Sequence, residues 1–300
     1  MTAPLPKSTP VAVLGLGIIG SRASARLREA GWQVRCWNRT PKGLAGETAT
    51  ATAATTGAGL ISIYLKDAPA VREVIAALAA GLGPGQIVLN HATVDLPTTQ
   101  WLAAVCAERG CGFLDVPFTG SKLAAASGQL VYYTGGDAEW LKQVEPYLRV
   151  TARNLLPCGG VGAATVVKLA TNLISACTVQ ALAEALAIST HHGVSAECLT
   201  GAVAENACAS PLAAMKLPTM AAAEFETHFS LDNMRKDSRY ALDLAAAAGV
   251  ATPAIQAVSG RMTELCEGGL AGLDFSALAQ PYLGGCLKNG RDRSPQRSGE

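Results

Sequence analysis

The ten residues VAVLGLGIIG, positions 11–20, decide the fold of this 300-residue chain. Their first four residues form an apolar run of the kind found in buried strands, and a helical pattern follows the last glycine. Between the two, Gly15 permits a tight turn, Gly17 lets a pyrophosphate approach the backbone, and Gly20 allows close helix–strand packing. Phosphate groups bind well at a helix N-terminus, where free N–H groups and the dipole favour negative charge. The strand–loop–helix context therefore predicts dinucleotide binding, with an ordinary glycine turn as the alternative.

The first half of the chain repeats this alternation of strand and helix. Helical patterns occur over residues 21–30, 69–80, 97–109 and 138–148, and strand-like runs occur over 33–37, 60–65, 87–89, 113–116 and 130–134. Strands separated by helices predict right-handed βαβ crossovers and a mainly parallel sheet. From Gly162 onward the strand pattern ends. Residues 163–192 contain neither glycine nor proline and predict one helix about 45 Å long.

Further helical stretches follow over 197–207, 212–222, 231–248 and 253–267, and a short one begins at Phe275. We therefore expect an α/β protein whose N-terminal Rossmann domain, residues 1–161, has a doubly wound, mainly parallel sheet. An all-α C-terminal domain, residues 162–287, is joined to it by the long interdomain helix. The polar tail, residues 288–300, is expected to be disordered.

The composition excludes several classes of function. There are 24 basic and 23 acidic residues, so nucleic acid is not an expected partner. The nine cysteines include no CxxC pair, which predicts reduced thiols in a cytoplasmic protein and no structural metal. The first ten residues have no apolar stretch, so we expect no signal peptide. Residues 153–184 are apolar but carry too many polar side chains for a simple membrane span.

The residues that follow the second expected strand indicate which dinucleotide is bound. An NAD enzyme places an acidic residue there against the ribose 2′-OH, whereas this chain has Asn38, Arg39 and Thr40, followed by Lys42. A guanidinium, a hydroxyl and an ammonium group suit a 2′-phosphate. The sequence therefore favours NADP(H), and the alternative is a solvated turn.

Lys168 is the only charged residue between Arg153 and Glu184. A lysine with apolar neighbours on nearly all sides of a helix is costly unless it serves a site. Asn172 lies four residues later, on the same helical face. Periodicity alone leaves open whether this lysine is catalytic or extends from the flank of the helix to the surface.

Two further segments carry polar groups of less specific meaning. The loop that contains Thr119, Gly120 and Ser121 follows a strand, at the sheet edge where ligands bind in α/β proteins. Its hydroxyls and backbone N–H groups suit a small carboxylate, although a plain turn explains them equally well. Lys236 and Asp237 lie on an expected helix, where charged pairs are usually solvated.

Together these segments resemble the β-hydroxyacid dehydrogenase family, which includes 3-hydroxyisobutyrate dehydrogenases and glyoxylate/succinic semialdehyde reductases and is similar to 6-phosphogluconate dehydrogenase. The resemblance covers residues 11–283. It rests on GLGIIG at 15–20, Thr93-Val94, DVPFTGSK at 115–122, GVGAATVVKLATN at 160–172, RKD at 235–237 and LDFSAL at 273–278. WNRT at 37–40 and GSK at 120–122 are closer to the NADPH-using reductase branch than to the NAD-using branch.

The resemblance implies roles for individual residues. Lys168 corresponds to the catalytic lysine, which donates a proton to the carbonyl oxygen. The expected substrate-binding residues are Thr119, Gly120, Ser121, Asn172 and Asp237. The expected cofactor-binding residues are Gly15, Leu16, Gly17, Ile18, Ile19, Gly20, Asn38, Arg39, Thr40, Leu65, Thr93 and Lys236.

The expected activity is the NADPH-dependent reduction of a small aldehyde or keto acid to the hydroxy acid. An imine reductase of the same fold is an alternative, although such enzymes usually lack lysine at the position of Lys168. A non-catalytic NADP-binding protein is another. The expected partners are a carboxylate-bearing small molecule and further copies of the chain, as a homodimer or homotetramer. Phe118, His91 and Lys66 depart from the family pattern, and we interpret His91 as a hydrogen-bonded structural residue.

Overall fold

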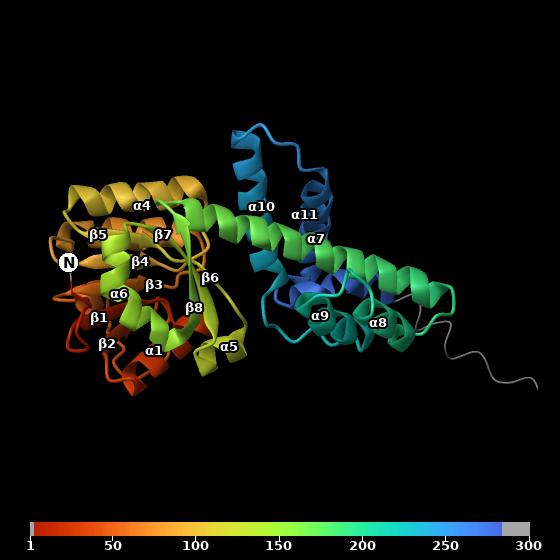
Figure 1. The fold of residues 1–300 in the computed structure, drawn as a ribbon, viewed down its shortest axis with the longest axis horizontal. Helices are drawn as coiled ribbons and strands as arrows, with labels where there is room; N and C mark the ends of the chain where they lie inside the picture. Colours follow the sequence, from red (N-terminus) through yellow and green to blue (C-terminus); the bar gives the residue numbers. More distant parts are fainter. Residues whose placement is uncertain (1–2, 284–300) are drawn as a thin grey trace, which may run out of the picture. The chain divides into compact units, whose positions relative to one another are not determined.

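The computed structural model describes residues 3–283, so the predicted tail at 288–300 lies outside the described part of the chain. Contacts within the chain divide it into two compact units, the first ending at Ala170 and the second beginning at Thr171 (Figure 1). The first unit is α/β and the second is helical. This is the fold class that the sequence predicts.

A single mixed sheet forms the middle of the first unit. Its strands follow the order β2-β1-β3-β4-β5-β7-β6, with β8 on the far side of β7. The pairs from β2 through β5 are all parallel, whereas β7 runs antiparallel to β5 and β6. The strands are β1 (Pro10–Leu14), β2 (Gln33–Trp37), β3 (Leu60–Ile63), β4 (Ile87–Asn90), β5 (Gly112–Asp115), β6 (Phe118–Thr119), β7 (Leu130–Gly136) and β8 (Ala152–Gly159).

Helices cover both faces of this sheet. The helices α1, α5 and α6 contact one another, and α3 contacts both α2 and α4. Right-handed crossovers place these two groups on opposite faces, as Figure 1 shows for α4 and α6. The helices are α1 (Ile18–Glu29), α2 (Ala51–Thr55), α3 (Ala68–Leu78), η1 (Ala79–Gly81), α4 (Leu96–Glu108), α5 (Lys122–Ser127) and α6 (Ala138–Thr151).

The strands and helices begin where the local chemistry favours them. All residues of β3, β4 and β5 are buried, as expected for parallel strands covered on both faces. Two helices start with an aspartate cap followed by proline: Asp67 accepts from Ala70 N at 3.0 Å, and Asp95 accepts from Thr98 N at 2.7 Å. The predictions of helices at these two prolines are confirmed.

The strand β8 was absent from the sequence prediction. It pairs with β7 alone, and only two of its eight residues are buried. Pro157 lies within it, and proline is tolerated in a strand only at an edge. Because the segment has neither an apolar run nor a clear alternation, no local pattern marked it as a strand.

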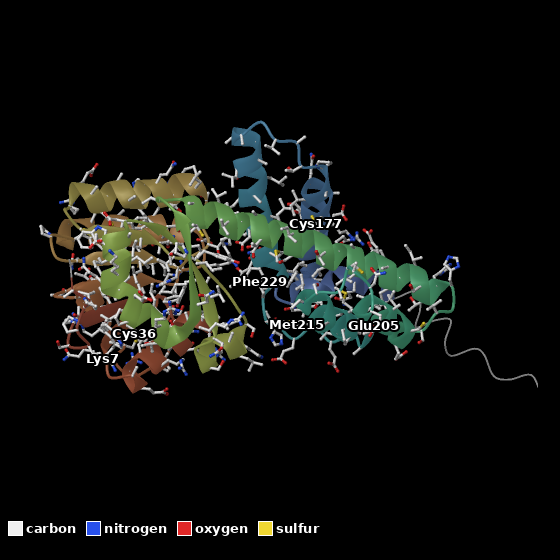
Figure 2. All side chains as sticks on the ribbon, in the orientation of Figure 1. Lys7, Cys36, Cys177, Glu205, Met215 and Phe229 are labelled. Atoms are coloured by element: carbon white, nitrogen blue, oxygen red, sulfur yellow. The ribbon has the colours of Figure 1, made fainter. Side chains whose placement is uncertain are left out.

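The second unit is a helical bundle with its own apolar core. Cys177 on α7 and Phe229 before α10 pack against this core, and both are labelled in Figure 2. A buried ion pair also lies in this unit, with Lys216 Nζ 2.6 Å from Asp274 Oδ1. The helices are α7 (Ala163–His191), α8 (Ala196–Ala204), α9 (Pro211–Ala221), α10 (Leu231–Ala247), α11 (Pro253–Leu265), η2 (Cys266–Leu270) and η3 (Phe275–Ala279).

The helix α7 has 29 residues and begins in the first unit. Among the described helices it is the one that is long and apolar enough to cross a membrane, by length and composition alone. A single helix of this kind is weak evidence for a span, because the core helix of a soluble protein meets the same criteria.

Candidate active site

The glycine loop follows β1 and opens α1, at the point where the strand order reverses between β1 and β3. Gly15 has a φ of +99°, and a Cβ there would lie 2.5 Å from Tyr64 O. A Cβ on Gly20 would lie 2.0 Å from Gly15 O. By contrast, a Cβ on Gly17 would have nothing within 4 Å. The protein itself therefore requires glycine at 15 and 20, whereas the space in front of Gly17 is open.

This opening suits the pyrophosphate of a dinucleotide. Gly17 is the N-cap of α1, no described side chain caps that helix, and its first turn holds no acidic residue. The free N–H groups and the positive end of the dipole are thus left for an anion. Ile18 is 43% exposed beside the opening, and Leu16 behind it is buried. The residues present fit a dinucleotide.

Asn38 connects the glycine loop to the end of β2. Its Oδ1 accepts from Leu16 N at 2.9 Å, and its Nδ2 donates to Thr40 O at 2.7 Å. Arg39 and Thr40, which follow it, are exposed. The carboxylate of Glu47 accepts from the backbone N–H groups of Lys42 and of Leu44 at 3.0 and 3.1 Å, and these bonds lower its pKa. The carboxylate of Glu47, the acidic residue nearest to this site in sequence, is therefore occupied by hydrogen bonds within its own loop.

The loops after β3 and β4 lie along the same edge of the sheet. Leu65 and Thr93 are both partly buried there. The side chain of Asn90 folds back onto its own loop, where it donates to Ala92 O at 3.2 Å and accepts from Ala92 N at 3.3 Å. The turn that precedes Thr93 is thus fixed by a side chain from the end of β4.

His91 lies behind this edge and is fully buried. Its Nδ1–H donates to Val116 O at 2.8 Å, and its Nε2 lies 3.3 Å from Ser62 Oγ, which in turn is 2.7 Å from Tyr147 OH. The ring stacks on Tyr64 with centroids 4.3 Å apart. Burial lowers the pKa of His91 to about 3, so the ring is neutral. This histidine is a structural residue.

The loop predicted to bind a carboxylate starts at β6. Thr119 and Gly120 are exposed, and Gly120 has a φ of +135°. Ser121 is the N-cap of α5, since its Oγ accepts from Ala124 N at 3.3 Å. Its hydroxyl therefore has a structural partner. Phe118 pairs with Tyr132 across β6 and β7, which holds one side of the loop.

Lys168 lies on the second turn of α7 and is only 9% exposed. It is thus a buried lysine and does not extend to the surface. Asp115, the last residue of β5, accepts from Thr165 N at 2.8 Å one turn earlier on the same helix. The sequence itself holds a sign of this contact. A charged residue ends the buried run of β5, and a buried carboxylate requires hydrogen-bond donors.

The predicted residues of the second unit form a group of their own. Asn172 Nδ2 donates to Asp237 Oδ2 at 2.7 Å, and Lys236 Nζ lies 2.8 Å from Asp237 Oδ1. Asp237 is 1% exposed. A buried carboxylate thus holds an amide and an ammonium group next to each other. The interpretation of the pair at 236–237 as a solvated face is wrong.

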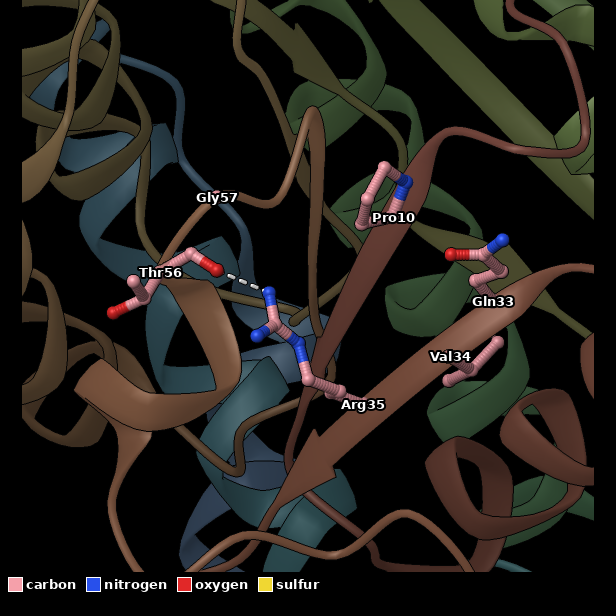
Figure 3. Close-up of a pocket in the computed structure, with 6 residues that line it drawn as sticks. All are labelled: Pro10, Gln33, Val34, Arg35, Thr56 and Gly57. Atoms are coloured by element: carbon pink, nitrogen blue, oxygen red, sulfur yellow. Dashed lines mark hydrogen bonds between the residues drawn. The ribbon is translucent and has the colours of Figure 1, made fainter.

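A hollow in the described part of the first unit lies elsewhere. It is lined by Pro10, Gln33, Val34, Arg35, Thr56 and Gly57 (Figure 3). Pro10 and Gln33 are the first residues of β1 and β2, so the hollow lies at the amino end of these strands. Ligands of α/β sheets bind at the carboxyl end. The side chain of Arg35 also donates to Thr56 O across it, and this hollow is not the nucleotide site.

Comparisons with known proteins agree with this geometry. Residues 10–160 match the model for the NAD binding domain of 6-phosphogluconate dehydrogenase, and residues 162–282 match that for the NAD-binding domain of NADP-dependent 3-hydroxyisobutyrate dehydrogenase. The chain is 28% identical to glyoxylate/succinic semialdehyde reductase 2, chloroplastic, from Arabidopsis thaliana over 90% of this chain and 78% of the relative.

Two solved structures show the same fold. The 3-hydroxyisobutyrate dehydrogenase of Mycobacterium tuberculosis, solved with L-serine, has a TM-score of 0.85 at 26% identity, covering 91% of this chain and 99% of that one. An imine reductase from Bacillus cereus has a TM-score of 0.58 at 19% identity, covering 91% and 98%, and shows the fold alone. The chain therefore belongs to the β-hydroxyacid dehydrogenase family of NAD(P)-dependent oxidoreductases.

Proposed function

We propose that this protein reduces a small aldehyde or keto acid, of the glyoxylate or succinic semialdehyde type, to the hydroxy acid with NADPH. The observation that carries the proposal is the buried Lys168 in the same compact unit as the dinucleotide loop. Burial of an ammonium group lowers the stability of a fold, so a lysine kept in such a place indicates a function, and general acid catalysis is one that needs it there. The 28% sequence identity to a glyoxylate/succinic semialdehyde reductase supports the proposed substrate class.

In this mechanism each residue has one task. The bound cofactor supplies the hydride that reaches the carbonyl carbon. The Nζ of Lys168 donates a proton to the carbonyl oxygen as the alkoxide forms. Thr119 Oγ1 and the N–H groups of Gly120 and Ser121 bind the substrate carboxylate. Asn172 donates to a substrate oxygen. Orientation and proton donation are the two terms that these side chains contribute.

Asp237 acts through its neighbours. Its bond of 2.7 Å fixes the amide of Asn172, and its ion pair fixes Lys236, which we propose contacts the cofactor. Thr93, held in its loop next to the Asn90 turn, contacts the nicotinamide end.

The preference for NADPH rests on the end of β2. Arg39 and Thr40 are exposed there and suit a 2′-phosphate. The carboxylate of Glu47 is engaged by backbone N–H groups, so it does not take the position of a ribose-binding acid. We therefore propose NADP(H) as the cofactor.

We also propose that the protein works as a cytoplasmic homodimer or homotetramer. Ile174 and Ile188 on α7 are 62% and 63% exposed. Ala181 lies midway between them, so the three residues recur every seven positions and share one face of the helix. An exposed apolar face of this kind is typical of subunit contacts.

The test is NADPH consumption with glyoxylate, succinic semialdehyde, other small aldehyde acids and a cyclic imine, with NADH as the cofactor comparison. Lys168→Ala should lower kcat by about 10²- to 10⁴-fold, the contribution of general acid catalysis. The matched control is Lys142→Ala, which removes an exposed lysine on α6 and should leave kcat unchanged.

Three other results would contradict the proposal. Turnover of the imine alone would indicate an imine reductase. NADPH binding without any turnover would indicate a non-catalytic protein. Equal kcat values for Lys168→Ala and the control would exclude Lys168 as the acid.

A further inference from the structure

A buried cluster of three side chains joins β5, α4 and α7. The Oγ1 of Thr165 lies 3.0 and 2.9 Å from the two carboxylate oxygens of Asp115, to which it donates, and 2.9 Å from Thr99 Oγ1. The backbone N–H of Thr165 also donates to Asp115 at 2.8 Å. All three side chains are at most 4% exposed. We call Asp115, Thr165 and Thr99 the Asp115 node.

One side of the node holds the helix that carries Lys168. Thr165 lies in the first turn of α7, three residues before Lys168, so the two side chains lie on neighbouring turns of one face. A carboxylate at this position also interacts favourably with the positive end of the helix dipole. The node therefore fixes both the start and the rotation of α7 at the level of Lys168.

The other side of the node continues into the predicted substrate loop. Asp115 ends β5, and β6 with Thr119 begins three residues later. Both backbone polar groups of the intervening Val116 are hydrogen-bonded. Its N–H donates to Asn90 O at 2.8 Å, and its carbonyl accepts from His91 Nδ1 at 2.8 Å. The short backbone segment between Asp115 and Thr119 is therefore held in place by hydrogen bonds.

Keeping a carboxylate in this place works against the stability of the fold. Burial raises the pKa of Asp115 to about 6, although donors at Thr165 and Gly162 lower it. At neutral pH the group is thus held ionised in the interior. An apolar residue would fill the same space without this cost, but it would offer no bond to α7.

We propose that the Asp115 node is a positioning device that sets Lys168 relative to the carboxylate-binding loop at Thr119 and Gly120. The inference rests on the proposed role of Lys168 as the proton donor. None of the node residues contacts substrate in this mechanism. They act through the geometry of α7, where a displacement of about 1 Å is enough to cost two orders of magnitude in rate.

The test compares two substitutions at one position. Thr165→Val removes only the hydroxyl, whereas Thr165→Ser keeps it. The control is Thr134→Val, because Thr134 is also a buried threonine of the first unit and its hydroxyl has no hydrogen-bond partner in the described part of the chain. Two readouts are measured for each: kcat and KM of the reductase reaction, and hydrogen–deuterium exchange of the amides of residues 163–168 without substrate.

Thr165→Val should lower kcat by about 10- to 100-fold with little change in the KM for NADPH, and should accelerate exchange in the first turns of α7. Thr165→Ser and Thr134→Val should stay near wild type in both readouts. If Thr165→Val folds poorly, Thr99→Val removes the bond to Thr165, together with a longer contact of 3.4 Å to Asp95 O within α4, and leaves the bonds between Thr165 and Asp115 in place. It should shift both readouts in the same direction by less.

The inference is overturned if Thr165→Val matches Thr134→Val in kcat and exchange, or if Thr165→Ser falls as far as Thr165→Val. A wild-type protein that turns over none of the aldehyde acids would instead overturn the proposed function. In that case the exchange readout by itself still decides whether the node holds α7.

Discussion

Replacing His91 should remove a large part of the acid sensitivity of the first unit. Burial lowers the pKa of this imidazole from 6.5 to about 3 in the folded chain. The unfolded chain therefore binds a proton below about pH 6.5, whereas the folded chain does not. The contribution of His91 to the free energy of unfolding is therefore fully present above that pH and is lost as the pH falls toward 3. Between about pH 7.5 and pH 4.5 the loss amounts to about 3 kcal/mol.

The assay uses the position of the tryptophans. All four, Trp32, Trp37, Trp101 and Trp140, precede residue 171, so their fluorescence reports unfolding of the first unit. Urea unfolding is measured at both pH values for wild type and His91→Gln, whose amide keeps a donor and an acceptor. The variant should be less stable at about pH 7.5 but should lose about 3 kcal/mol less on acidification.

The exposed His191→Gln is the control and should follow wild type. The raised pKa of Asp115 contributes to the pH dependence with the opposite sign, but it is common to all three proteins and cancels in the comparison. Equal losses on acidification for wild type and His91→Gln would refute the reasoning, since a neutral buried ring could not then be the source.

Three further substitutions test other parts of the structure. Gly17→Ala should leave the melting temperature unchanged and weaken NADPH binding by about tenfold or more, because its Cβ meets no protein atom but enters the pyrophosphate space. Gly20→Ala should instead destabilise the fold by about 3 kcal/mol, since its Cβ would lie 2.0 Å from Gly15 O; equal melting temperatures for the two variants would contradict this. Lys216→Met removes the ion-pair partner of the buried Asp274, whose carboxylate keeps its hydrogen bonds from His228, Phe229 and Ser276, and should cost about 3 kcal/mol in a circular-dichroism unfolding experiment. Adding Asp274→Asn should restore part of that loss, and no restoration would argue against an uncompensated charge as the cause.

Much of the fold follows from local patterns in the sequence. The buried runs of β1 and β3, and the prolines behind Asp67 and Asp95, each determine structure within about ten residues. The strand β8 could not be found in this way, since it exists through its pairing with β7 and its own side chains are mostly exposed. Its stability comes from a neighbour that a local pattern does not show.

The same division applies to the candidate site. The glycine loop and Lys168 stand out locally, one by its spacing and the other by its lone charge in an apolar helix. The contact of Asp115 with Thr165 joins residues 50 positions apart, and that of Ser62 with Tyr147 spans 85. Such pairs depend on how the sheet and its helices are assembled. Because the partners are so far apart in the sequence, no short motif includes both of them.

The difference among the three loop glycines bears on how this chain could change in evolution. Gly15 and Gly20 are required by contacts within the protein, so a descendant that no longer bound a nucleotide would still keep both. A Cβ at position 17 would have no protein atom within 4 Å, so Gly17 could be replaced by another residue once nucleotide binding was lost. A relative that had lost nucleotide binding would therefore still have glycine at positions 15 and 20. Of the three glycines, the one at position 17 is the one whose replacement would indicate that selection for the nucleotide had ended.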